Sequence, residues 1–240
     1  YPDNIILFRM GDFYETFDND AKIASSILGI TLTKRANGAA SKVPLAGFPF
    51  HSLEQYIHKL TKAGYRVAIC EQVEDPKMVK GIVKREVVEI VTPGTSISEK
   101  YLKRNENNFL LSIYFSKDIN GISILDVSTG EFIAGDVKDN EILNTILQFE
   151  PKEILIPDSQ KDQLRKILNS EKYFITTLQD WVWEEDIALD ELKDTFKVAS
   201  LKGFGIDQFY NGVSASGAVL FYLKNKLLKK IDHISNIKCL

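Results

Sequence analysis

The order of apolar and polar positions predicts a short strand and then a long helix at the start of the chain. Residues 5–10 are almost wholly apolar, as in a buried strand. Spacings of three and four, typical of one helix face, then occur at Tyr14, Phe17, Ala21, Ala24 and Leu28. We therefore expect a helix from Asp12 to Leu28, with Gly29 placed to end it.

The rest of the first half reads as strands with one further helix. Residues 30–35 alternate like a strand, and the small residues of 36–49 predict a loop. Ser52 and Gln55 match a capping box, which predicts a helix that ends near Gly64. Two more strands are predicted, at 65–73 and 86–95. The first half is therefore expected to be an α/β domain with a mixed sheet.

The second half begins with three predicted strands joined by tight turns. These strands cover 108–116, 121–128 and 129–137, and Asn120-Gly121 is a hairpin signal between the first two. Helices and strands then follow at 139–149, 153–157, 159–169, 173–178, 184–195 and 212–229. Three antiparallel strands followed by alternating helices and strands is the order of a ribonuclease-H-like α/β fold. Such a topology does not by itself determine an activity.

A polar stretch at 96–107 predicts the boundary between a first domain, 1–105, and a second domain, 106–232. The formal net charge of −3 is unevenly divided between the two halves. Residues 1–105 carry 15 Lys/Arg and 12 Asp/Glu, whereas residues 106–240 carry 15 and 21. The first domain is therefore the one expected to face an anion.

Composition excludes several classes of protein. The chain is 44% hydrophobic and 26% charged, as in a folded globular protein. No apolar run approaches the roughly 20 residues of a membrane span, and the first residues do not form a signal-peptide pattern. Cys70 and Cys239 lie far apart, which favours a reducing cytoplasm over a disulfide framework. The three histidines and two cysteines are not in ligand spacing, so no metal site is expected.

Several motifs resemble one family of DNA-repair proteins. "LFRMGDFYETFDNDAKIAS", "ITLTKR", "VPLAGFPFHSLEQYIHKL", "VAICEQVEDP" and "EIVTPGT" follow one another at the spacing found in the N-terminal part of the MutS family. The likeness is looser in the second half, where it rests on "LDVSTGEF", "GFG" and the last helix. The chain resembles the mismatch-recognition domain and connector domain of a MutS protein, with 233–240 as the start of a following domain.

The resemblance implies specific roles. In MutS a Phe-x-Glu motif enters the minor groove at a mispair, and Phe13 and Glu15 match it here. The phenylalanine would stack on the mispaired or unpaired base, the glutamate would hydrogen-bond it, and Lys34 and Arg35 would lie at the DNA backbone. The connector would relay signals and bind MutL. ATP, Mg²⁺ and homodimerisation would belong to domains outside this chain, in a cytoplasmic, nucleoid-associated protein.

The residues themselves are compatible with these roles and leave alternatives open. Lys42 and Arg85 are further candidates for phosphate contacts beside Lys34 and Arg35. Leu45 fits either a minor-groove contact or ordinary loop packing. Asp12-x-x-Glu15 also matches a capping pattern, so Glu15 fits a helix cap as well as a base contact. A lone Phe13 beside a helix face is, by itself, more typical of a peripheral core residue.

Two other functions fit parts of the sequence. A metal-dependent nuclease would centre on Asp126, with Glu153 and Asp207 as conceivable partners, because such an enzyme needs converging carboxylates. An aspartate that bonds to its own turn is the favoured interpretation of Asp126. A protein-interaction scaffold that keeps only the fold is the other alternative, but such relatives typically lack the Phe-x-Glu pair. No GxxxxGK[ST] motif occurs, so the chain is not expected to bind ATP through a P-loop. The resemblance to MutS further implies that this part of the protein senses and relays, without a cofactor or a reaction of its own.

Overall fold

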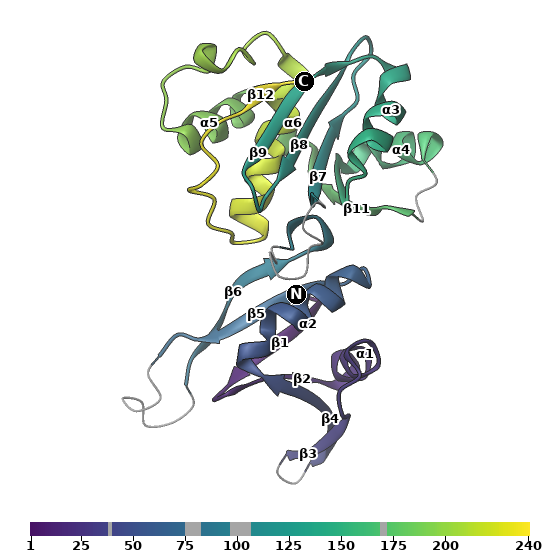
Figure 1. Cartoon of the computed structure of the whole chain (residues 1–240), viewed down its shortest axis with the longest axis vertical. Helices are drawn as coiled ribbons and strands as arrows, with labels where there is room; N and C mark the ends of the chain where they lie inside the picture. Colours follow the sequence, from purple (N-terminus) through teal and green to yellow (C-terminus); the bar gives the residue numbers. More distant parts are fainter. Residues whose placement is uncertain (38–39, 75–82, 97–106, 169–171) are drawn as a thin grey trace. The chain divides into compact units, whose positions relative to one another are not determined.

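The computed structural model describes residues 1–37, 40–74, 83–96, 107–168 and 172–240 (Figure 1). The chain divides into two compact units, Tyr1–Tyr101 and Leu102–Leu240. Most of the polar stretch in which the boundary was predicted lies outside the described residues. Among the helices that the structure describes, none has both the length and the apolar character needed to cross a membrane.

The first unit is built on a six-stranded mixed sheet with the order β3-β4-β2-β1-β5-β6. β1 and β5 run parallel, and all other neighbours are antiparallel. The strands are β1 (Asn4–Met10), β2 (Phe13–Phe17), β3 (Thr33–Asn37), β4 (Ala40–Pro49), β5 (Arg66–Gln72) and β6 (Arg85–Val91). The helices are α1 (Asp18–Leu28) and α2 (Leu53–Lys62).

One face of this sheet is covered by the two helices. Every second residue of the inner strands points to this face, and these side chains form one cluster with α1 and α2. The strands contribute Ile5, Leu7, Tyr14, Phe48, Val67, Ile69 and Val91, and the helices Ala24, Leu28, Ile57 and Leu60. Side chains on the opposite face of the sheet are therefore not part of this core.

The segment before α1 is a strand, and the prediction of a helix from Asp12 is wrong at this point. β2 alternates between accessible residues and buried ones, because a strand repeats every two residues. α1 begins only at Asp18 and ends at Gly29, whose φ of +69° fits the predicted end. Asp12 and Glu15 therefore precede the helix, and the interpretation of Glu15 as its cap is also wrong.

Two further local predictions are wrong. Most of 36–49 forms β4 and the end of β3 rather than a loop, although residues 38–39 lie outside the described part. β4 contains alanine, glycine and proline, which are poor strand formers, but its pairing with β2 and β3 outweighs that preference. Ser52 occupies the N-cap position of α2 without a side-chain capping bond, so the proposed capping box is not formed.

The second unit has a six-stranded sheet with the order β11-β10-β7-β8-β9-β12. β7, β8 and β9 are antiparallel, whereas β10 and β11 run parallel to β7. The strands are β7 (Phe109–Tyr114), β8 (Asn120–Asp126), β9 (Glu131–Val137), β10 (Glu153–Pro157), β11 (Phe174–Leu178) and β12 (Lys238–Cys239). The helices are α3 (Asp139–Phe149), α4 (Lys161–Ile167), α5 (Glu185–Phe196) and α6 (Tyr210–Phe221), the last continued by a π-helical turn. This is the predicted ribonuclease-H-like order.

Helices cover both faces of this sheet (Figure 1). α3 and α4 pack on the face that carries Phe109, Leu111 and Ile113, and α6 packs on the other face with α5 behind it. β12 adds to the edge at β9, so the last residues pack against this sheet. Whether 233–240 also lead into a further domain stays a prediction.

Candidate nucleic-acid interface

The residues singled out by the sequence lie around a tight hairpin. Met10 pairs with Phe13, so the β1–β2 turn contains only Gly11 and Asp12. Gly11 has a φ of +61°, and glycine is favoured at the first position of a two-residue turn of this kind. Phe13 is therefore the first residue of β2, at the tip of the hairpin.

Phe13 and Glu15 point to the same face of the sheet, away from the core. The Phe13 residue is 48% exposed, a large value for a phenylalanine, and Glu15 is partly exposed. Tyr14, between them, is buried on the opposite face, where its hydroxyl donates to a Glu71 carboxylate oxygen. Burial first, and then Glu71, raises the pKa of Tyr14. The buried Tyr14 thus anchors the strand that presents the two accessible side chains.

Strand pairing brings Leu45 to the same face. Phe17 pairs with Leu45, Glu15 with Gly47, and Phe13 with Pro49. Because directly paired residues project to one side of a sheet, Leu45 lies on the face of Phe13 and Glu15. Leu45 is partly buried and lies in β4, not in the loop in which the sequence placed it.

Gly47 leaves room for the Glu15 side chain. A Cβ added at Gly47 would lie 3.0 Å from the Tyr14 carbonyl oxygen and 3.4 Å from Glu15 Cγ. We expect Gly47→Ala to separate β4 from β2 slightly and to lower the free energy of unfolding by about 1–2 kcal/mol, as overpacking does. Amide hydrogen exchange checks this, since β2 and β4 should exchange faster while β7–β9 of the second unit, the internal control, should not change. Unchanged exchange in β2 and β4 would contradict the prediction.

The candidate phosphate-binding cations lie on both sides of β2. Lys34 and Lys42 are exposed on the β3–β4 hairpin, and Arg35 pairs with Val43 through its backbone. The side chain of Arg35 lies outside the described part of the structure. Arg85 belongs to β6 at the other edge of the sheet. Its Nε donates to the Arg9 carbonyl oxygen at 3.0 Å and its Nη1 to that of Val83 at 3.1 Å.

Two residues at the hairpin tip were missed by the sequence reasoning. Arg9 places its guanidinium carbon 4.0 Å from the centroid of the Phe50 ring, and Phe50 is 43% exposed. Their contact joins β1 to the turn after β4. The available signal was an arginine inside an otherwise apolar strand, which is an unusual place for a charge.

The carboxylates of the nuclease alternative do not converge. Asp126 pairs with Phe109 and Glu153 with Leu110, so these two acids lie on opposite faces of the sheet. Asp126 accepts bonds from the Ser128 backbone and hydroxyl, and from the backbone of Thr129 and Asn108. Within the described residues no three His, Cys, Asp or Glu side chains gather as metal ligands. The grouping of Asp126 with Glu153 is therefore wrong, and Asp126 instead stabilises the turn that follows it through hydrogen bonds.

Glu153 is held by hydrogen bonds to two buried hydroxyl groups. It is fully buried and accepts hydrogen bonds from the Thr176 hydroxyl at 2.6 Å and the Tyr222 hydroxyl at 2.7 Å. These bonds tie β10 to β11 and to the end of the last helix. Asp207, the third acid of that hypothesis, is exposed in the segment before α6.

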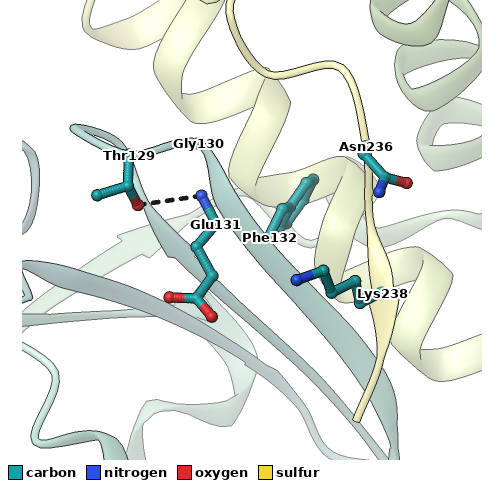
Figure 2. Close-up of a pocket in the computed structure, with 6 residues that line it drawn as sticks. All are labelled: Thr129, Gly130, Glu131, Phe132, Asn236 and Lys238. Atoms are coloured by element: carbon teal, nitrogen blue, oxygen red, sulfur yellow. Dashed lines mark hydrogen bonds between the residues drawn. The ribbon is translucent and has the colours of Figure 1, made fainter.

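The second unit has an open hollow of about 280 Å³ at its β9–β12 edge (Figure 2). Its lining consists of Thr129, Gly130, Glu131, Phe132, Asn236 and Lys238. The Glu131 amide donates to the Thr129 hydroxyl at 3.2 Å, which closes the β8–β9 turn at its rim. One acid and one base on an open hollow do not define a ligand.

Comparisons with known proteins match both units. The family model described as MutS domain I matches residues 1–100, and that of MutS domain II matches 108–237. Curated relatives named DNA mismatch repair protein MutS include those of Flavobacterium psychrophilum, 51% identical over 237 residues, and Phocaeicola vulgatus, 47% identical over 237 residues. Each alignment covers 99% of this chain and 27% of the relative. The chain thus spans about a quarter of its relatives' length, and it belongs to the MutS family, of which it comprises domains I and II.

Proposed function

We propose that the first unit recognises mispaired or unpaired bases in duplex DNA, with Phe13 as a wedge in the minor groove and Glu15 as its polar partner. The observation that carries this proposal is an exposed phenylalanine at a hairpin tip, with a carboxylate two residues on along the same face. The relatives' printed name, DNA mismatch repair protein, supports the same role.

A wedge of this kind selects by deformability rather than by base sequence. Inserting an apolar side chain costs a few kcal/mol of unstacking per step, and the cost is least where a base is mispaired. An aromatic ring stacks on every base, so one residue serves many mispairs. A mismatched site also kinks more easily than a paired one. Phe13 is suited to this task because its ring is accessible without any change in the core.

Glu15 supplies discrimination and not affinity. An ionised carboxylate accepts hydrogen bonds and donates none, so it can accept one from a base N–H that a mispair leaves accessible. Near the phosphates of a fully paired duplex it is repelled, which penalises the competing ligand. Affinity is assigned to Lys34, Arg35, Lys42 and Arg85, with Leu45 beside the groove. Arg85 has five N–H donors, and its two backbone bonds use two of them.

The second unit is proposed to relay the state of the first unit to the rest of the protein and to contact MutL. Because the chain spans only about a quarter of its relatives' length, ATP and Mg²⁺ binding and homodimerisation are assigned to other parts of the protein. No catalytic step is assigned to the residues of this chain, and a cytoplasmic, nucleoid-associated location goes with that role.

Binding of the intact protein to two matched duplexes tests the proposal. The duplexes have the same length and flanking sequence, and one carries a single mispair or unpaired base. We expect the dissociation constant to be at least about tenfold lower for the second duplex, since one unstacking step of a paired duplex costs a few kcal/mol. A single-stranded oligonucleotide is the control for binding through charge alone. Equal affinity for the two duplexes would refute mismatch recognition.

A further inference from the structure

The turn that carries Phe13 is held by the side chain of Arg9. Arg9 is the next-to-last residue of β1, and its Nε donates to the Gly11 carbonyl oxygen inside the two-residue turn. A charged donor makes a stronger hydrogen bond than a neutral one. The conformation of the turn is therefore fixed by a side chain as well as by the ladder between β1 and β2.

Phe50 holds the second residue of the same turn. Its backbone N–H donates to the Asp12 carbonyl oxygen at 2.9 Å, and its ring lies under the Arg9 guanidinium. The guanidinium carbon is 4.0 Å from the Phe50 centroid and 5.6 Å from that of Tyr14, both within the range of cation–π attraction. Both residues of the turn are thus tied to the Arg9–Phe50 pair.

The backbone of Arg9 is itself fixed from the edge of the sheet. Arg85 Nε donates to the Arg9 carbonyl oxygen at 3.0 Å, across the neighbouring strand β5. We call Arg9, Phe50 and Arg85 the tip brace. Its contacts meet at Gly11, Asp12 and Arg9, which are the residues leading directly into Phe13.

We propose that Arg9 is a positioning residue, whose guanidinium holds the Gly11–Asp12 turn against Phe50 so that the Phe13 ring projects in a fixed direction. This inference rests on the proposed wedge function of Phe13. A wedge that is ordered before binding loses less conformational freedom when it enters DNA. The Gly11 carbonyl engages the Arg9 Nε donor and Phe50 covers one face of the guanidinium, so Arg9 is placed to act through Phe13. The salt dependence of binding distinguishes this role from a phosphate contact.

Arg9→Lys in the intact protein tests this role. Lysine keeps the charge but lacks the planar group that stacks on Phe50 and donates through Nε. We expect the preference for mispaired over paired duplex to fall about tenfold, which is the size of one lost hydrogen bond to a charged group. Affinity for paired duplex and the slope of log K against log salt should stay as in the parent protein, since no phosphate contact is removed. Arg165→Lys, in an exposed ion pair with Asp162 in the second unit, is the matched control.

Phe50→Leu is the second variant, because it removes the stacking surface without changing a charge. Phe50 is 43% exposed, so the fold should tolerate the change, and the preference should fall in the same direction. Phe13→Ala is measured in the same assay. A shallower salt slope in Arg9→Lys would identify a phosphate contact and overturn the positioning role. Unchanged preference in both brace variants, with loss in Phe13→Ala, would overturn this inference alone. Unchanged preference in Phe13→Ala would overturn the wedge function itself.

Discussion

Replacing Phe13 by alanine in the intact protein is expected to remove most of the proposed preference for mispaired DNA while leaving the affinity for paired duplex nearly unchanged. Stacking of a base on an aromatic side chain is worth about 1–3 kcal/mol, so the ratio of the two dissociation constants should fall roughly 5- to 150-fold. The fold should not suffer, because Phe13 is 48% exposed and does not belong to the core cluster of the first unit.

Fluorescence anisotropy with labelled duplexes at one salt concentration measures both dissociation constants. Tyr65→Ala is the matched control, since Tyr65 is also an exposed aromatic residue of the first unit. It precedes Arg66, which pairs with Asn4 at the end of β1 opposite the hairpin tip. Tyr65→Ala should keep the preference for mispaired DNA. If Phe13→Ala keeps it too, the ring does not enter the duplex.

Replacing Gly121 by alanine is expected to unfold or severely destabilise the second unit. An added Cβ would lie 1.9 Å from the Asn211 carbonyl oxygen and 2.1 Å from the carbonyl carbon, both at the start of α6. Neither is the end of a flexible side chain, so α6 would have to move off the sheet. Gly212 also lies close to β9, although less so, since its own added Cβ would lie 2.9 Å from the Gly135 oxygen. Overpacking of this severity costs about 3 kcal/mol or more.

Tryptophan fluorescence during urea unfolding measures this effect selectively. Both tryptophans, Trp181 and Trp183, are in the second unit, and Trp183 is buried with its indole N–H donated to Ser112. Gly203→Ala is the control, because a Cβ there meets nothing within 4 Å. Its urea midpoint should stay near that of the parent. If the urea midpoint of Gly121→Ala equalled that of Gly203→Ala, the start of α6 would be able to move away from Gly121 without loss of stability, and the prediction would be wrong.

The fold of the second unit was predictable because local signals and tertiary pairing agree there. A hairpin does join β7 to β8, although Asn120 and Gly121 belong to β8 rather than to the turn, and the apolar runs of 108–116 and 153–157 correspond to buried strands. In the first unit the local signals conflict with the strand pairing. Tyr14 and Phe17 fit a helical spacing, yet five residues of alternation and pairing with two neighbours make β2 a strand. A window of only a few residues cannot distinguish the two-residue period of a strand from the 3.6-residue period of a helix.

The candidate site could be predicted from sequence only where its residues are close in the chain. Phe13 and Glu15 form one local motif, whereas the contact of Arg9 with Phe50 joins positions 41 residues apart, as their numbers show. Leu45 was named, but its place on the same face as Glu15 and Phe13 depends on strand register. Register follows from the whole sheet and is not encoded in any one segment.

The strand form of β2 also limits which changes of length the motif tolerates. Since side chains alternate strictly, inserting or deleting one residue between Gly11 and Tyr14 would exchange the two faces of the strand. Tyr14 would then leave its partner Glu71 and turn to solvent, while a phenylalanine and an acid would enter the apolar interior. The packing of the core therefore constrains the spacing of Phe13 and Glu15 from the glycine turn, independently of what these two side chains bind.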